Sequence, residues 1–413
     1  MDFESKEDDD RISDFPDHIL CHILSFIPTK YAVRTSVLSK RWKNLWASVP
    51  ILDFDARLHG GFNSVIKMNE YPESEITFQN FVNRVMLLND ILHIQKFRLI
   101  YECHYSAAPI STWLHVATSH DILELELDFY LSVPKEFISF PMLKILEIRW
   151  VVYLDDKSTQ KLLSGCQVLE ELVIEETTRE KPRVIDISMH TLKSFCFSYR
   201  FAIDISVDCP YKFVINAPNL EYFHVKGRIS DDFVVKSLGN LVNAHLDLRH
   251  TAVLSDNYNL CQQRVFNLFK GITNVKFLLL SNDIVQLLSA AYNLNLPRFF
   301  NLTTVGLGIG VDICWKRLVT EFIRCSPDMD ALVLNNKQGL YGDIEELHKI
   351  PRRHMPENLL FQLKDILIQE LYSNFLPEAV ENLLQDVNVL KRLSITCQCP
   401  IMLESLIGDA FES

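Results

Sequence analysis

The sequence predicts a mixed α/β protein with an N-terminal bundle of three short helices, a curved solenoid of parallel strands with helices or loops outside, and a C-terminal cap. Two observations favour this architecture: an unusually apolar stretch over residues 14–46, and a short apolar motif that recurs through most of the 413 residues. The composition, 48% hydrophobic and 23% charged, is typical of a folded chain. We divide it into an acidic flexible lead (1–10), the helices (11–48), the solenoid (49–345) and the cap (346–413).

Charge and hydropathy exclude several classes of function. A net charge of −12 argues against capture of nucleic acid, because such binding depends on clustered Lys and Arg that neutralise phosphates. The compact basic cluster at residues 352–354 is interpreted as solvated surface. No apolar run approaches the roughly 18 residues of a membrane span, and the acidic start is unlike a targeting peptide. We therefore expect a protein of the nucleus, the cytoplasm or both, with its ten cysteines reduced and mostly buried.

The apolar stretch begins with an amphipathic helix. Pro16 suits a first helical position, and Pro28 should end the helix. The apolar residues between them recur at spacings of three and four, which places them on one helical face: Ile19, Leu20, Ile23, Leu24 and Ile27. A second helix is expected over residues 30–37. Ser39 should then cap a third helix, with Trp42, Leu45 and Trp46 on one stripe.

A unit of under about 40 residues rarely buries a core of its own without disulfides, a metal or a partner, so this apolar surface requires a cover. The pattern F-P-D-x-I-L-x-x-I-L-S-x-I-P from Phe15, continuing to S-x-L-S-x-R-W-x-x-L-W at Trp46, resembles the F-box. F-boxes dock substrate receptors onto Skp-type adaptors of cullin ubiquitin ligases. Phe15 departs from the usual leucine, a change that should preserve docking. The resemblance implies a set of residues that contact the adaptor or, for about half of them, pack inside the helices: Phe15, Pro16, Ile19, Leu20, Ile23, Leu24, Leu38 and Trp42.

The second signal is a repeated motif, apolar-x-x-apolar-x-apolar. Its last two positions lie two residues apart, which puts both side chains on one face of a strand. It opens with Val49, Leu52 and Phe54, and its later occurrences begin at Ile94, Ile122, Leu143, Leu169, Leu192, Leu220, Leu241, Val275, Leu302, Met329, Leu363 and Leu390.

Steps between the later units run from 21 residues (122 to 143) to 34 residues (241 to 275), which brackets the period of leucine-rich repeats. We expect one parallel strand per unit. Helices are predicted over 78–88, 158–165, 260–270, 283–292 and 312–324. Because no such unit can bury its apolar face alone, the units must stack into a solenoid.

The concave strands should carry the contacts to a target protein. Aromatic and arginine side chains are favoured at interfaces, and the candidates are Arg149, Trp150, Tyr199, Arg200, Tyr222 and Arg249. Most polar residues on these strands are expected simply to face water.

Residues 356–396 resemble the FBD domain that closes many plant F-box and leucine-rich-repeat proteins. Residues 356–359, P-E-N-L, stand where that family has P-E-C-L, and the family's glycine-rich turn is absent. We expect strands over 363–369 and 390–396, with a helix opened by Pro377 between them. Such a segment can shield the last apolar face of the solenoid from water.

Three groups of residues have spacings that could support chemistry. His18, Cys21 and His22 have metal-like spacing but lie in the first helix, where a polar or interface role is favoured. Gly306, Gly308 and Gly310 alternate within a repeat strand and lack the Lys-Ser/Thr of a phosphate loop, so they indicate a close-packed strand. Cys397 and Cys399 lie on one face of a strand and are expected to pack.

We therefore predict no catalytic residues, no metal and no cofactor. The resemblances imply a non-catalytic substrate-recognition subunit of a Skp-cullin-F-box ubiquitin ligase, whose F-box binds the adaptor, and through it the cullin, while the repeats hold an unknown target. Two alternatives remain open: a binding scaffold not coupled to ubiquitin transfer, and a receptor that needs a small molecule to hold its target.

Overall fold

The computed structural model divides into two compact units, residues Met1–Thr177 and Thr178–Ser413, and each is considered separately. Within the part of the chain that the structure describes, no helix has the length and apolar character needed to cross a membrane. The structure describes residues 12, 14–59, 72–101, 108–128, 139–149, 156–176, 183–199, 211–229, 231–249, 258–291, 294–308, 315–335, 363–371 and 392–397.

The first unit opens with two of the three predicted helices. Helix α1 (Asp17–Leu24) has Pro16 as its N-cap, and α2 (Thr29–Arg34) continues into the 3-10 turn η1 (Thr35–Val37). The prediction of a third α-helix from Ser39 is wrong, because residues 40–44 form turns and only the 3-10 turn η2 (Leu45–Ser48) follows. The predicted stripe is still buried, because Trp42, Leu45 and Trp46 are at most 9% exposed. The two large indole side chains therefore reach the core without an α-helix.

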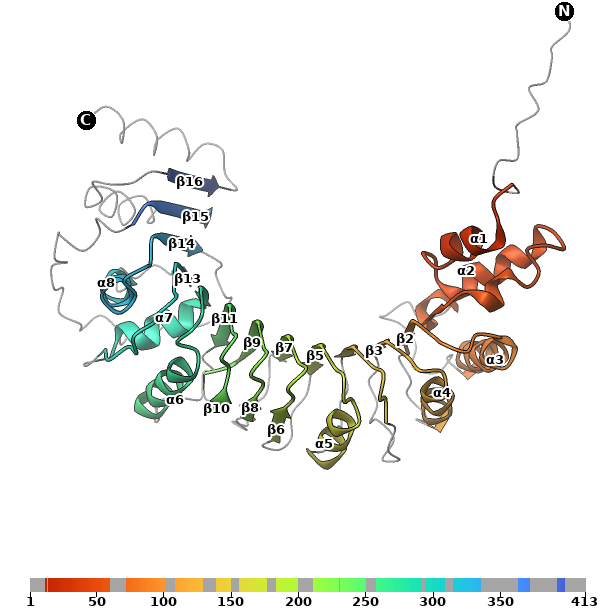
Figure 1. Cartoon of the computed structure of the whole chain (residues 1–413), viewed down its shortest axis with the longest axis horizontal. Coiled ribbons are helices and arrows are strands. Elements are labelled where there is room, and N and C mark those ends of the chain that lie inside the picture. The colour runs from red at the N-terminus through yellow and green to blue at the C-terminus, as the bar shows by residue number, and fades with distance from the viewer. Residues whose placement is uncertain are drawn as a thin grey trace, which may run out of the picture. The chain divides into compact units, whose positions relative to one another are not determined.

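Five parallel strands follow in the first unit, each paired with the next along the chain. They are β1 (Ile51–Asp55), β2 (Lys96–Ile100), β3 (Glu124–Asp128), β4 (Ile145–Arg149) and β5 (Glu171–Glu176). Three further helices of this unit lie on one side of these strands (Figure 1). They are α3 (Pro72–Leu88), α4 (Ala108–Thr118) and α5 (Asp156–Ser164), and the 3-10 turn η3 (Ala56–His59) follows β1.

An aromatic cluster joins two of these helices to the sheet. The Phe78 ring of α3 stacks on Tyr101 with centroids 5.3 Å apart and meets the edge of Trp113 of α4 at 6.0 Å. On β1, Phe54 contacts Phe97 of β2 at 5.7 Å. The core of this unit therefore lies between the helices and the sheet, and it leaves the opposite face of the sheet open.

The second unit repeats the arrangement with eight parallel strands in one sheet. They are β7 (Ser194–Tyr199), β9 (Tyr222–Arg228), β11 (Asn243–Arg249), β12 (Phe277–Leu280), β13 (Thr304–Gly308), β14 (Ala331–Asn335), β15 (Asp365–Leu371) and β16 (Arg392–Cys397). Helices α6 (Tyr258–Gly271), α7 (Asn282–Ser289) and α8 (Trp315–Cys325) lie on one side of it (Figure 1).

A separate three-stranded parallel sheet covers the first of these strands. It consists of β6 (Arg183–Ser188), β8 (Tyr211–Asn216) and β10 (Asp232–Ser237), in the order β10-β8-β6. Phe213 of β8 stacks on Phe233 of β10 at 4.9 Å and meets the Phe197 ring of β7 at the same separation. These strands were not predicted, and here they take the place that helices occupy in other repeats.

The repeat prediction is confirmed, because each occurrence of the motif coincides with one of the strands β1–β5, β7, β9 and β11–β16. Wherever these motif side chains are described, they are at most 3% exposed. The helices predicted over 78–88, 158–165, 260–270, 283–292 and 312–324 are found as α3, α5, α6, α7 and α8. Helix α4 was missed.

At the C-terminal end, β15 and β16 confirm the two expected strands and continue the parallel sheet. Several predictions lie outside the described residues: the acidic lead, the basic cluster at 352–354, the P-E-N-L motif at 356–359, the helix opened by Pro377, and Trp150, Arg200, Gly310 and Cys399.

Candidate functional site

Helices α1 and α2 and the 3-10 turn η1 expose an apolar surface, although the core that they share is filled. Leu20, Leu24 and Ala32 are at most 2% exposed, so these helices do not lack internal packing. Around them, large apolar side chains face outward, the most exposed being Val37 (86%), Phe26 (74%) and Leu38 (64%). We call the complete set the apolar helix surface: Ile12, Phe15, Ile23, Phe26, Ile27, Tyr31, Val37 and Leu38.

The eight residues predicted to contact or brace a partner divide by burial. Leu20, Leu24 and Trp42 are buried and hold the helices together. The remaining side chains lie at the surface or near it: Phe15, Pro16, Ile23 and Leu38 are exposed, and Ile19 is half-buried.

Phe26, Tyr31 and Val37 were not singled out from the sequence. Phe26 lies three residues beyond Ile23, so the spacing that marked the first helix also contained this signal. Val37 lies in the 3-10 turn after α2, where helical periodicity gives no guide to exposure.

Polar contacts fix the geometry of the apolar helix surface. Arg41 forms an ion pair with Asp17 at 2.7 Å and also donates to the carbonyl of Phe15, which ties the start of α1 to the turn after η1. The Cys21 thiol donates to the carbonyl of Leu45 at 3.4 Å. These contacts hold α1 against the segment that follows η1.

A cleft of about 630 Å³ lies between α1 and the segment around η2, lined in part by His18, Cys21 and His22. Within the described residues, no group of three His, Cys, Asp or Glu side chains is placed to hold a metal ion. Burial, reinforced by the nearby Asp17 carboxylate, raises the pKa of the Cys21 thiol. Because the thiolate is the metal ligand and nucleophile, this environment suits neither role.

The open face of the first unit's sheet carries charges that pair with one another. Arg98 of β2 lies 3.0 Å from both Asp53 of β1 and Glu126 of β3, and Lys96 lies 3.2 Å from Glu126. Burial raises the pKa of Asp53 although Arg98 opposes the shift. Burial also acts on Glu126, but the hydrogen bonds and charges of Arg98 and Lys96 outweigh it and lower the pKa of that carboxyl.

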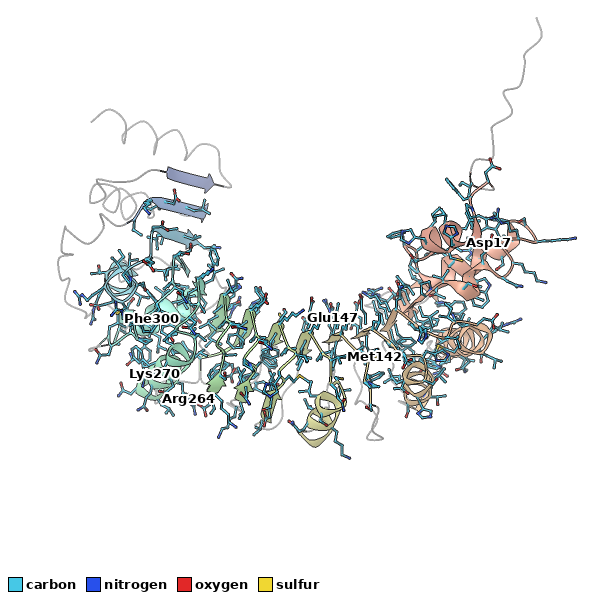
Figure 2. The ribbon with its side chains drawn as sticks, viewed as in Figure 1. Asp17, Met142, Glu147, Arg264, Lys270 and Phe300 are labelled. Carbon is cyan, nitrogen blue, oxygen red and sulfur yellow. The ribbon has the colours of Figure 1, made fainter. Side chains whose placement is uncertain are left out.

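Arg149 in the first unit and Tyr199 in the second were both predicted to contact a target, but only Arg149 lies on the open face. Arg149 is part of the open face and forms an ion pair with Glu147 at 2.8 Å; Figure 2 shows Glu147 on the side of the strands away from α5. Tyr199, by contrast, is only 1% exposed, so its prediction as a surface contact is wrong. Strand alternation places it on the buried face with Phe195 and Phe197.

The open face of the second unit's sheet is different in composition. Tyr222 of β9 and Phe277 and Leu279 of β12 are each 38% to 43% exposed there. The rings of His224 and His245 stack beside them with centroids 4.3 Å apart. Arg249, another predicted contact, lies at the end of β11 and pairs with Asp247 at 3.3 Å. Figure 2 shows Arg264 and Lys270 of α6 on the helical side, away from this face.

The geometry therefore defines a class of protein: a repeat protein with open sheet faces for binding and an N-terminal helical module with an exposed apolar surface. Sequence comparison agrees with this class. The F-box domain family matches residues 12–54, and a family described as "FBD-associated F-box protein At5g56370, LRR repeats" matches residues 90–238.

Curated relatives from Arabidopsis thaliana extend the match to most of the chain. The putative F-box protein At1g58310 is 31% identical over 392 residues, covering 83% of this chain and 76% of the relative. The putative F-box/LRR-repeat protein At4g00320 is 29% identical over 388 residues, 82% and 75% of the two chains. The putative F-box/FBD/LRR-repeat protein At5g44950 is 26% identical over 430 residues, 94% and 92%. The chain belongs to this plant family of F-box proteins with leucine-rich repeats.

Proposed function

We propose that this chain is the substrate-recognition subunit of a Skp-cullin-F-box ubiquitin ligase. The F-box family generally supplies such adaptors, and the chain's own match to it spans residues 12–54. In this role the apolar helix surface docks a Skp-type adaptor and, through it, a cullin, while the repeats hold the target protein. The single observation that carries the proposal is the apolar helix surface itself, which remains exposed on helices whose core is already packed.

The chain would perform no chemistry in this complex. Its contribution is proximity: holding a target lysine near the charged transfer enzyme raises the effective concentration of the reacting groups. We propose the nucleus, the cytoplasm or both as its location, where the ligase components act. We also propose the division at residues 48/49 and 345/346 between F-box, repeats and FBD-like cap.

Co-purification tests the complex. The full chain, expressed with a Skp-type adaptor and a cullin, should bring both partners through affinity purification and size exclusion. An Ile23→Lys and Leu38→Lys double variant should lose both, because each substitution places a charge on an exposed apolar contact without touching the buried core. Retention of the adaptor by the double variant would contradict the proposal.

A second step separates a ligase subunit from a scaffold. The purified complex should support ubiquitin transfer to a target bound at the repeats once ubiquitin-activating and ubiquitin-conjugating enzymes and a ring-finger subunit are added. A complex that binds adaptor and target yet transfers no ubiquitin would indicate the scaffold.

A further inference from the structure

Across strands β7 to β14, the open face of the sheet in the second unit carries two adjacent rows without an acidic residue, lysine or arginine; the next strand, β15, then places Asp365 in register with Ala331. The register of β7, β9, β11, β12, β13 and β14 defines both rows. The histidine row consists of Cys196, His224, His245, Leu279, Gly306 and Val333. The aromatic row consists of Ser194, Tyr222, Asn243, Phe277, Thr304 and Ala331.

These rows face away from the core of the unit. In β9 and β11 the neighbouring positions Phe223, Val225, Ala244 and Leu246 are buried, so alternation directs the two rows to the opposite face. The apolar side chains of the rows are nevertheless large and accessible: Tyr222 is 38%, Phe277 43% and Leu279 38% exposed. They come from strands that lie within two positions of each other in the sheet.

A glycine shapes the surface between β12 and β13. A Cβ atom on Gly306 would lie 2.1 Å from Cδ2 of Leu279, so the leucine side chain occupies the space that any larger residue at 306 would need. Leu279 therefore lies across β13 and broadens the apolar area that Phe277 begins. Phe277 and Leu279, two residues apart on one strand, therefore expose apolar side chains on the same face.

The His224 side chain adds polarity to the row without a charge at neutral pH. Their rings are parallel to within 6°, and the Cys196 sulfur lies 3.5 Å from Nδ1 of His224. Burial, followed by the neighbouring His245, lowers the pKa of His224 to about 4. Asp247 opposes this shift and Lys226 adds to it. The Tyr222 ring also faces His224, with the two ring centroids 6.4 Å apart. A neutral imidazole can still exchange hydrogen bonds with a polypeptide backbone.

We propose that the histidine and aromatic rows form the target-binding site, and that this site takes a segment presenting uncharged aromatic or aliphatic side chains. This inference rests on the proposed function, which assigns target binding to the repeats. A charged side chain placed on Phe277 or Leu279 would lose hydration without meeting an opposite charge in either row, whereas an apolar one would bury area against these two residues. The open face of the first unit offers the contrast, since Asp53, Lys96, Arg98 and Glu126 form ion pairs with one another there.

Short synthetic peptides test the proposal directly. We would prepare three sets on one Gly/Ser background, bearing Phe and Leu, Lys, or Glu at alternate positions, and measure their binding to the full chain by fluorescence anisotropy. The Phe/Leu set should bind best. Phe277→Asp and Leu279→Asp should each weaken that binding by about tenfold or more, whereas Glu147→Gln, on the open face of the other unit, should leave it unchanged.

Preference for a charged set, insensitivity to both aspartate variants, or binding of no set would overturn the proposal. Thermal unfolding of each variant checks the fold, and Tyr222→Ser with Phe277→Ser provides a milder pair if an aspartate variant fails to fold. Adaptor binding measured on the same samples separates the two proposals. Adaptor bound without any peptide preference contradicts the site alone, whereas no adaptor bound by the wild-type chain contradicts the proposed function.

Discussion

The backbone N–H of Asp53 donates a hydrogen bond to Oγ1 of Thr29 at 2.8 Å, joining helix α2 to the first repeat strand, β1. Thr29 is only 4% exposed, so this contact lies in the interior. Lys30 adds a second link by donating to the carbonyl of Leu58, just beyond β1. The F-box match, which ends at residue 54, covers both partners of the first link. The F-box helices are therefore anchored to the first repeat strand.

Breaking this link should destabilise the protein. Thr29→Val keeps the shape of the side chain but leaves the half-buried Asp53 N–H without its acceptor, and we expect a loss of about 1–2 kcal/mol in the free energy of unfolding. Thr29→Ser should recover most of the loss, and Ser48→Ala, at an exposed position, should change stability by less than about 0.5 kcal/mol. Urea denaturation followed by circular dichroism measures all three. Equal stability of Thr29→Val and wild type would show that the bond contributes nothing.

The F-box residues should separate into core and contact residues. Leu20→Ala removes a side chain that is 0% exposed and should cost about 2–5 kcal/mol of unfolding free energy. Phe26→Ala truncates a side chain that is 74% exposed and should cost less than about 0.5 kcal/mol. Thermal denaturation of the two variants provides the comparison. A large loss of stability in Phe26→Ala would mean that Phe26 belongs to the core.

Close packing around β13 should make Gly308 intolerant of a side chain. A Cβ atom there would lie 2.4 Å from the backbone nitrogen of Asn282, at the start of α7, and backbone cannot move aside as a flexible side chain can. We expect Gly308→Ala to cost about 1–3 kcal/mol. Gly239→Ala is the matched control, because its nearest neighbour would be 3.9 Å away. Chemical denaturation that ranks the two alanine variants equally would contradict this packing.

Stability should fall as the pH decreases from about 6.5 to about 4. Burial and the neighbouring His245 lower the pKa of His224 from 6.5 to about 4, so within this window the unfolded chain binds a proton that the folded chain does not. Stability is fully retained above this window and declines through it. His224→Asn should reduce the decline without removing it, because burial and Lys30 also lower the pKa of His59 to about 4. Urea midpoints measured across this pH range test the prediction, and identical slopes for variant and wild type would contradict it.

The strands of the repeats were easier to predict from the sequence than the helices and outer strands that cover them. A motif with buried positions two residues apart identifies a strand wherever it occurs, since only a strand places such residues on one face. The outer strands β6, β8 and β10 were not predicted, because the segments between repeat strands were expected to be helices or loops. Yet Ile185 and Ile187 in β6, and Phe213 and Ile215 in β8, show the same two-residue spacing and are all buried. That spacing was the available signal.

The helical module shows why partner contacts are harder to predict than the core. Leu20 and Ile23 belong to the same periodic pattern, but the first is 0% exposed and the second 43%. Periodicity marks apolar residues without indicating whether the protein itself or a partner covers them. The prediction of a third helix was wrong for another reason. Asn44 has a φ of −118° and a ψ of −3°, which departs from α-helical backbone, and only a 3-10 turn follows it. The large Trp42 and Trp46 side chains remain buried without helical geometry.

Affinity for a purified Skp-type adaptor tests the central claim most directly. In titration calorimetry, the wild-type chain should bind the adaptor, and the Ile23→Lys and Leu38→Lys double variant should bind at least about tenfold more weakly while unfolding at the same temperature. Leu279→Lys, a matched charge on the exposed face of the second unit, should bind like wild type. Equal adaptor affinity of the double variant and the wild-type chain would contradict the assignment of the apolar helix surface as the docking site.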